Sequence, residues 1–307
     1  MFLNGLITND LKTLAVNSWM PAVFPNVQGR LLAAVRVLHR DDAFLIDTES
    51  ATHDTVLKSL ERYTLAGDFR VADITSETAM LSVQGKQAEE VVRATLGEEA
   101  ARAERQQVFK TRFGDSGEAT VIRATHTAED GFDLFVERND AQTLRDALTN
   151  AGAQPISAEA LETLRIEAGV ARYGIDMDQT NVVTETNLDD AVSFSKGCYI
   201  GQEIIARIKY RDHVAKKLSG VMLESDLSIE KGATILSDDE KEIGRIMSAT
   251  FSPSLARTIA LGYVKYDYLA PGTRVKVVSS EQEYAAAVAE LPFIRGSWYE
   301  NEAPSGA

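Results

Sequence analysis

The chain contains, at residues 196–203, the stretch Lys196-Gly197-Cys198-Tyr199-Ile200-Gly201-Gln202-Glu203, which differs from the rest of its 307 residues in composition and charge. It holds the single cysteine of the chain, and two glycines bracket that cysteine. From residue 196 to residue 217, six basic and two acidic residues give a local charge of +4, whereas the whole chain has a net charge of −14. This contrast indicates an anionic partner at this segment.

The same stretch predicts a reactive loop. Glycine accepts positive φ angles and lets two backbones approach closely, so the two glycines predict a tight, partly exposed loop before a short helix over residues 202–208. A helix N-terminus and a neighbouring lysine both favour the thiolate form of a cysteine. We therefore predict that Cys198 is the functional thiol, with Lys196 and Gln202 beside it in a catalytic role. The alternative is that Cys198 is a small buried hydrophobic residue.

The overall composition is that of a globular protein, because 44% of the residues are apolar and 25% are charged. The net charge of −14 repels phosphate backbones and anionic lipids, so direct nucleic-acid binding and membrane binding are not expected. The N-terminus lacks a basic signal region, and no run reaches the roughly 18 apolar residues of a membrane span, which favours a cytoplasmic protein. One cysteine and four scattered histidines give no set with metal-ligand spacing, so no metal site is predicted.

The first two hundred residues predict an α+β domain with antiparallel sheets, because pairs of strands alternate with amphipathic helices. The predicted strand pairs are Ala33–Leu38 with Phe44–Asp47, Phe69–Ile74 with Met80–Val83, and Thr120–Ala124 with Phe132–Val136. The predicted helices are Asp54–Leu65, Lys86–Leu96 and Asp140–Leu148.

The last third of the chain predicts a small β-barrel, because short strands follow one another with turn residues between them. The predicted strands are Leu218–Leu223, Ala233–Leu236, Gly244–Ala249, Ile259–Val264, Arg274–Val278 and Tyr284–Ala289. The expected organisation is a first domain over residues 1–212, a C-terminal β-barrel domain over residues 213–295 and a flexible polar tail over residues 296–307.

Four segments make the chain resemble known families. Residues 196–203, followed by Arg207, resemble the Lys-Gly-Cys-aromatic-x-Gly-Gln-Glu signature of YgfZ-type proteins. The other three resemble segments of the glycine-cleavage T protein superfamily, and they are Leu164-Arg165-Ile166-Glu167-Ala168-Gly169 with Tyr173-Gly174-Ile175-Asp176, Phe2-Leu3-Asn4-Gly5-Leu6-Ile7-Thr8-Asn9-Asp10, and Ile259-Ala260-Leu261-Gly262-Tyr263-Val264.

The resemblance implies a folate-binding domain of the T-protein type over residues 1–212, followed by the barrel. Membership of the YgfZ group implies a tetrahydrofolate-binding protein that assists the assembly or repair of iron–sulfur enzymes, including tRNA-modifying ones. It also implies tetrahydrofolate or a derivative as cofactor, folate and iron–sulfur client proteins as partners, and Cys198 as the functional thiol.

Three residues of the Arg-x-Glu-Ala-Gly region are candidate folate contacts under this resemblance. Glu167 is the hypothesised pterin partner, since a buried carboxylate accepts two hydrogen bonds from the amide and amine edge of the ring. The alternative for Glu167 is an exposed helix carboxylate. Tyr173 and Asp176 either flank the pterin or p-aminobenzoyl group or are ordinary loop residues.

Three further residues complete the predicted cofactor site. Asn9 and Asp10 either line the cavity or cap a helix. Arg207 either attracts the anionic glutamyl tail of folate or belongs to a solvated helix face.

Residues 28–34 depart from the T-protein pattern. There the family has a Gly-Gly-Ile-Val-Asp-Asp-like segment that supplies a catalytic aspartate, whereas this chain has Ala33 and Ala34 where the aspartates would stand. Without that carboxylate no evident group orients the folate nitrogen and assists aminomethyl transfer. The sequence therefore disfavours an ordinary aminomethyltransferase, and a folate-dependent aminomethyl- or methyltransferase of the T-protein type is the alternative function.

Overall fold

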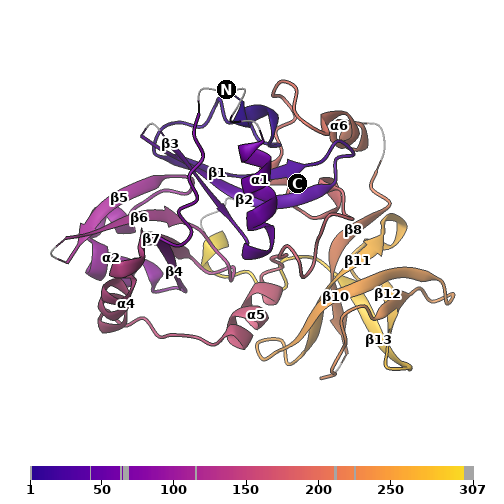
Figure 1. Ribbon diagram of the computed structural model, residues 1–307. Coiled ribbons are helices and arrows are strands. Elements are labelled where there is room, and N and C mark those ends of the chain that lie inside the picture. Colours follow the sequence, from indigo (N-terminus) through magenta and orange to yellow (C-terminus); the bar gives the residue numbers. More distant parts are fainter. Residues whose placement is uncertain are drawn as a thin grey trace.

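The computed structural model describes residues 2–41, 43–62, 64, 69–114, 116–210, 213–224 and 226–300. Two antiparallel sheets form the first part of the chain, and a closed β-barrel forms the last part. Figure 1 shows the first sheet above, the second sheet and the barrel on opposite sides, and the helix α5 between them.

The first sheet has the order β1-β2-β3, formed by Ser18–Pro25, Leu31–Arg40 and Ala43–Thr48. Alternate residues of β2 are buried, including Ala33, Val35 and Val37, and they pack beside α1 (His53–Glu61) and the N-terminal segment. That segment begins with the short 3-10 helix η1 (Leu3–Gly5), and η2 (Ser50–Thr52) precedes α1. The period of two along β2 leaves its opposite face toward the second sheet.

The second sheet has the order β4-β7-β6-β5, and its strands are Thr78–Gln84, Gly131–Glu137, Gly117–Arg123 and Val108–Phe113. Its helices are α2 (Ala88–Leu96), α3 (Glu98–Ala101) and α4 (Ala141–Asn150), the last preceded by η4 (Arg138–Asp140). Phe132 and Leu134 of β7 pack with apolar residues of these helices. The intervening Asp133 therefore projects from the other face, toward the first sheet.

A mostly irregular segment connects the two sheets to the barrel. It contains α5 (Ala158–Glu167), η5 (Val183–Glu185), η6 (Asp189–Ala191) and α6 (Gln202–Tyr210). Helix α5 is capped at its start by the Ser157 side chain, which accepts a hydrogen bond from the Ala160 amide. Its last turn packs against β10 and β11 of the barrel, so α5 ends where the domains meet.

The barrel is closed in the order β10-β11-β8-β13-β12-β9, with β9 pairing back to β10. Its strands are β8 (Lys216–Leu223), β9 (Thr234–Leu236), β10 (Glu242–Ser252), β11 (Arg257–Lys265), β12 (Arg274–Ser279) and β13 (Gln282–Ala289). Apolar side chains such as Val221, Ile246 and Val277 fill the interior. The 3-10 helices η7 (Tyr266–Tyr268) and η8 (Ser297–Tyr299) are the helical elements described after residue 213.

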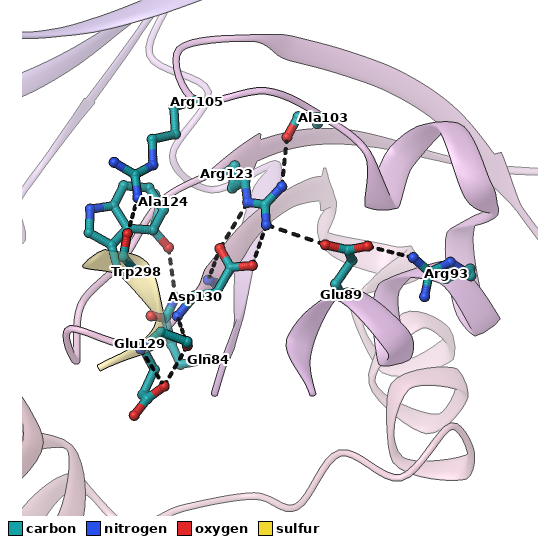
Figure 2. A network of polar contacts seen from close by, with 12 residues as sticks. Gln84, Glu89, Arg93, Ala103, Arg105, Arg123, Ala124, Glu129, Asp130 and Trp298 are labelled. Carbon is teal, nitrogen blue, oxygen red and sulfur yellow. Dashed lines mark hydrogen bonds and ion pairs between the residues drawn. The ribbon is translucent and has the colours of Figure 1, made fainter. Parts of the chain in front are cut away.

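Residues 294–300, here called the C-terminal strap, leave the barrel and reach the second sheet. The Ile294 amide donates to the Glu167 carbonyl at 3.1 Å, and the Trp298 amide donates to the Ala128 carbonyl at 3.2 Å. The Arg105 guanidinium lies 3.9 Å from the centre of the Trp298 ring and donates to the Trp298 carbonyl (Figure 2). The strap thus links the barrel, α5 and the second sheet.

Figure 2 also shows the ion-pair network beneath the strap. Arg123 pairs with Asp130 and Glu89, and Arg93 pairs with Glu89 on the same helix. Glu89, Arg123 and Asp130 line a recess of about 450 Å³ together with Trp298 and other strap residues. Each of these charged side chains is paired with one of opposite charge, so the network forms a satisfied polar surface against which the strap packs.

The predicted fold class is confirmed, since an α+β part with antiparallel sheets precedes a small β-barrel. The predicted strand over Phe69–Ile74 is wrong. That stretch is irregular because it has no apolar layer to face, and the Asp73 side chain accepts from the Thr75 amide and turns the chain. The strands β1 and β5 were not predicted. The helix α1 ends at Glu61, and the predicted end at residue 65 lies outside the described residues.

The first predicted domain boundary and the predicted tail include residues that the structure does not describe. Residues 211 and 212, beside the expected boundary, and residues 301–307 of the expected tail lie outside the described residues. Within the described part of the chain, no helix is long and apolar enough to cross a membrane.

Candidate functional site

A chain of charged side chains crosses the contact between the two sheets. Arg36 of β2 donates from Nε to Asp47 Oδ2 on β3 at 2.8 Å and from Nη1 to Asp133 on β7. Its guanidinium carbon lies 5.7 Å from the centre of the Phe135 ring. Asp47 and Asp133 together raise the pKa of Arg36 against the opposing effect of burial. The ion pair between Arg36 and Asp133 therefore connects the two sheets.

Asp133 is the buried centre of this group, with no exposed surface. His126, in the connection between β6 and β7, places Nε2 at 2.9 and 3.1 Å from its two oxygens. Burial alone would raise the pKa of Asp133, but the hydrogen bonds and charges of His126 and Arg36 lower this pKa to about 2. The carboxylate is therefore anionic at neutral pH.

A second buried ion pair lies between α5 and the barrel. Arg165 donates from Nη1 to Asp176 Oδ2 at 2.6 Å, and Asp176 is completely buried. The Arg172 amide donates to the same carboxylate at 2.9 Å, and Ser248 of β10 donates to its other oxygen at 2.5 Å. Asp176 is thus a fully bonded structural group that fixes the loop after α5 to the barrel.

Glu167 ends α5 and is only 5% exposed. Its Oε1 accepts a hydrogen bond from Ser252 of β10, and Ser252 in turn accepts from the Leu255 amide. Among the described residues, Oε2 has no hydrogen-bond partner. A buried carboxylate with one oxygen held and the other unused is suited to accept hydrogen bonds from a ligand.

Two other predicted cofactor residues, Tyr173 and Asn9, lie in the loop after α5 and in the N-terminal segment. Half-buried Tyr173 lies near Glu167 in sequence, its hydroxyl is 3.5 Å from the Leu31 carbonyl, and burial raises its pKa. Asn9 donates from Nδ2 to the Pro21 and Asp190 carbonyls at 2.8 and 3.0 Å, so its amide connects the N-terminal segment to β1.

Asp10 and Arg207 take different positions. The Asp10 carboxylate accepts from the Lys12 amide at 3.2 Å and stabilises a turn. Arg207 lies exposed on α6, near the loop that carries Cys198.

Lys196 binds the N-terminal segment. It is 6% exposed, and its ammonium donates to the carbonyls of Asn4, Ile7 and Asn9 at 2.6, 2.9 and 2.6 Å. Burial lowers the pKa of Lys196 to about 8. All three ammonium hydrogens are directed at backbone oxygens, so the geometry gives this lysine a structural task instead of contact with the thiol.

Cys198 is exposed and lines a recess of about 440 Å³ with Phe2, Lys12 and their neighbours. Gly201 has a φ angle of +77°, and a Cβ at this position would lie 2.4 Å from the Asn26 carbonyl oxygen. The close approach predicted from the sequence is therefore present at Gly201. Gly197 has open space around it and an ordinary φ angle. Gln202 begins α6 immediately after this loop.

The sequence interpretation missed the charged group between the sheets, which consists of Arg36, Asp47, His126 and Asp133. One signal was available, since Asp133 interrupts an otherwise apolar strand. Among the described residues, no cluster of three or more histidine, cysteine, aspartate or glutamate side chains could hold a metal ion.

These features define a two-part protein in which a pair of antiparallel sheets precedes a closed barrel, and a buried carboxylate at the end of α5 lies against the barrel strand β10. Residues 1–196 match the GCVT N-terminal domain, and residues 216–294 match the glycine cleavage T-protein C-terminal barrel domain. The chain belongs to the glycine-cleavage T-protein family.

Relatives and a solved structure agree with this assignment. An aminomethyltransferase of Rubrobacter xylanophilus is 31% identical over 95% of this chain and 77% of the relative. One of Alcanivorax borkumensis is 31% identical over 96% of this chain and 80% of the relative. The crystal structure of glycine cleavage system aminomethyltransferase T from Bartonella henselae has a TM-score of 0.84 at 21% identity, over 96% of this chain and 81% of that one.

The comparisons correct the expected function. The sequence interpretation gave the chain a YgfZ-like role in the assembly or repair of iron–sulfur enzymes, whereas these similar proteins are aminomethyltransferases. The interpretation relied on the eight residues around Cys198, but the similarity to aminomethyltransferases extends over nearly the whole chain. The comparisons do not support YgfZ membership, iron–sulfur client proteins or tRNA modification.

Proposed function

We propose that this protein is a folate-dependent aminomethyltransferase of the T-protein type, which transfers a one-carbon group to tetrahydrofolate. The observation that carries the proposal is the alignment of aminomethyltransferases over 95–96% of the chain, through both domains.

The geometry of Glu167 fits a pterin ligand. Ser252 holds one carboxylate oxygen, which fixes the direction of the group, and the second oxygen is left to accept from the amine or amide edge of the ring. Tyr173 adds a half-buried aromatic face a short distance along the chain. Together these residues provide orientation by hydrogen bonding and affinity by apolar contact.

Calorimetric titration of tetrahydrofolate into the wild type and Glu167→Gln tests the binding half of the proposal. We expect saturable binding by the wild type and at least tenfold weaker binding by the variant, since the amide presents a donor where the ligand also donates. Glu162→Gln is the matched control, because this glutamate lies on the same helix and pairs with Arg165. Turnover of an aminomethyl-lipoyl donor with tetrahydrofolate tests the catalytic half, and absence of both binding and turnover refutes the proposal.

A further inference from the structure

Cys198 lines a recess to which the proposed function assigns no task. The recess has a volume of about 440 Å³, which suits a small molecule, and it lies between the N-terminal segment and residues 197–200. Two attachments fix these walls to each other. The Lys196 ammonium donates to three carbonyls of the N-terminal segment, and the Ile200 amide donates to the Gly5 carbonyl at 3.1 Å. The recess is therefore a built feature in which an exposed thiol faces fixed neighbours.

Asn4 brings an unpaired hydrogen-bond donor to this recess. The residue lines the recess and is only 7% exposed, and its side chain faces the Leu11 amide at 2.7 Å. Because an amide N–H can only donate, the side-chain atom that faces it is the oxygen Oδ1.

The other end of the same carboxamide, Nδ2, has no hydrogen-bond partner among the described residues. Nor is Nδ2 among the described side-chain atoms that are completely buried without a partner, so it keeps surface toward the recess that Asn4 lines. A buried side chain that is fixed at one end and has an unpaired donor at the other is suited to a ligand that supplies an acceptor.

The charge of the recess is positive. Lys12 lines it, and the Lys12 ammonium has no ion-pair partner among the described residues. None of the described residues that line the recess is an aspartate or a glutamate, and Asp10, the nearest acid along the chain, accepts from the Lys12 backbone amide at 3.2 Å. Phe2, Leu6 and Ile200 add apolar surface. A cation and an unpaired amide donor beside apolar side chains are complementary to a carboxylate on a small apolar body.

We propose that this recess binds a small disulfide that carries a carboxylate, and that Cys198 exchanges with it to form a mixed disulfide. Lys12 and Asn4 hold the carboxylate, and the exposed thiol meets the sulfur atoms. This inference does not depend on the proposed function.

The exchange balances without a further reagent. The Cys198 thiolate attacks one sulfur of the ligand, a bond forms between these two sulfur atoms, and the sulfur–sulfur bond of the ligand breaks. The departing half leaves with the bonding electron pair and takes up the proton that Cys198 has lost. Cys198 is oxidised, and the departing sulfur is reduced to a thiol. The chain has no second cysteine to resolve the mixed disulfide, so a second small thiol regenerates Cys198.

Exchange kinetics of the full-length protein with two disulfides of opposite charge test the proposal. The probes are dithiodiglycolate, which is anionic, and cystamine, which is cationic, and each rate is divided by the rate of the same probe with N-acetylcysteinamide, a neutral thiol. Mass spectrometry of the product reports on Cys198 alone, because the chain has one cysteine. The net charge of −14 by itself favours cystamine. We expect the opposite, a normalised rate at least about tenfold higher for dithiodiglycolate at low salt, with the preference shrinking as salt is added.

Two variants separate recognition by the recess from simple exposure of the thiol. Lys12→Gln removes the cation, and Asn4→Asp keeps the acceptor for the Leu11 amide but replaces the donor Nδ2 by an oxygen. Each is expected to lower the normalised dithiodiglycolate rate at least about fivefold and to leave the cystamine rate no lower than in the wild type. Lys241→Gln is the matched control, because it makes the same change of net charge at an exposed lysine of the barrel that pairs with Asp239, and it is expected to keep the wild-type rates.

The inference is wrong if the wild type forms no mixed disulfide, or if its normalised rates with the two probes are equal or favour cystamine. It is also wrong if Lys12→Gln reacts with dithiodiglycolate as fast as the wild type does. Circular dichroism checks that each variant is folded, and should Asn4→Asp fail to fold, Lys12→Gln decides. Turnover with tetrahydrofolate, measured on the same wild-type protein, bears only on the proposed function.

Discussion

Replacement of Lys196 by methionine tests the attachment between the N-terminal segment and residues 196–203. The lysine ammonium donates to three carbonyls, those of Asn4, Ile7 and Asn9, and the residue is 6% exposed. Methionine keeps an unbranched apolar stem of similar length, so the substitution removes the charge and the hydrogen bonds and largely retains the packing.

The expected loss of unfolding free energy follows from the three carbonyl oxygens that lose their donor. A buried acceptor left without its hydrogen bond costs about 1 kcal/mol or more. We therefore expect Lys196→Met to lose about 3 kcal/mol. Because the pKa of Lys196 is lowered only to about 8, the ammonium is mostly charged at pH 7, where this estimate applies.

Urea unfolding followed by far-ultraviolet circular dichroism at pH 7 measures the effect. Lys12→Met is the control, because Lys12 is exposed nearby, and its change is expected to be within about 0.5 kcal/mol. A loss below about 1 kcal/mol in Lys196→Met would show that the three hydrogen bonds merely replace equally good contacts with water, and the reasoning would be wrong.

Three further outcomes are expected. Gly201→Ala should lose at least about 2 kcal/mol in urea unfolding, because its Cβ would lie 2.4 Å from the Asn26 oxygen at a positive φ, whereas Gly197→Ala should be near neutral; equal effects would contradict this. The stability advantage of the wild type over Asp133→Asn should shrink by about 2 kcal/mol as the pH falls from 5 to 2, because the folded-state pKa of Asp133 lies below its unfolded value; a constant difference would oppose it. Trp298→Ala should lose about 1 kcal/mol and expose the strap to limited proteolysis, and an unchanged cleavage pattern would count against the contact with the second sheet.

The sequence predicted those parts of the fold whose signals are local. Each predicted strand of the barrel corresponds to an observed one, since short apolar runs and turn residues mark them directly. The requirement for glycine at position 201 was also local, because it follows from the turn that the chain makes there. The strand β1, which contains Pro21 and Pro25, was missed because proline is uncommon in strands.

The interactions of the site residues could not be predicted, because their hydrogen-bond partners lie far away in the sequence. Lys196 lies beside Cys198, which suggested that it acts on the thiol, but its hydrogen-bond partners lie near residue 4, almost two hundred positions away. Asp133 meets Arg36 only because two separate sheets pack face to face. Asp133 is a signal in itself, because it interrupts an apolar strand, but nothing near it in the sequence identifies Arg36 as its partner. The expected YgfZ-like function failed for a related reason, since one short signature was given more weight than the rest of the chain.

The C-terminal strap also has a consequence for how the protein is made. Ser297 donates from its amide to Glu129 at 3.0 Å, across 168 positions of the chain. During translation the second sheet can form its own hydrogen bonds before residues 294–300 have been synthesised, so its contact with the strap forms later. A nascent chain that has not yet reached residue 294 lacks the hydrogen bonds by which the strap joins α5 and the second sheet.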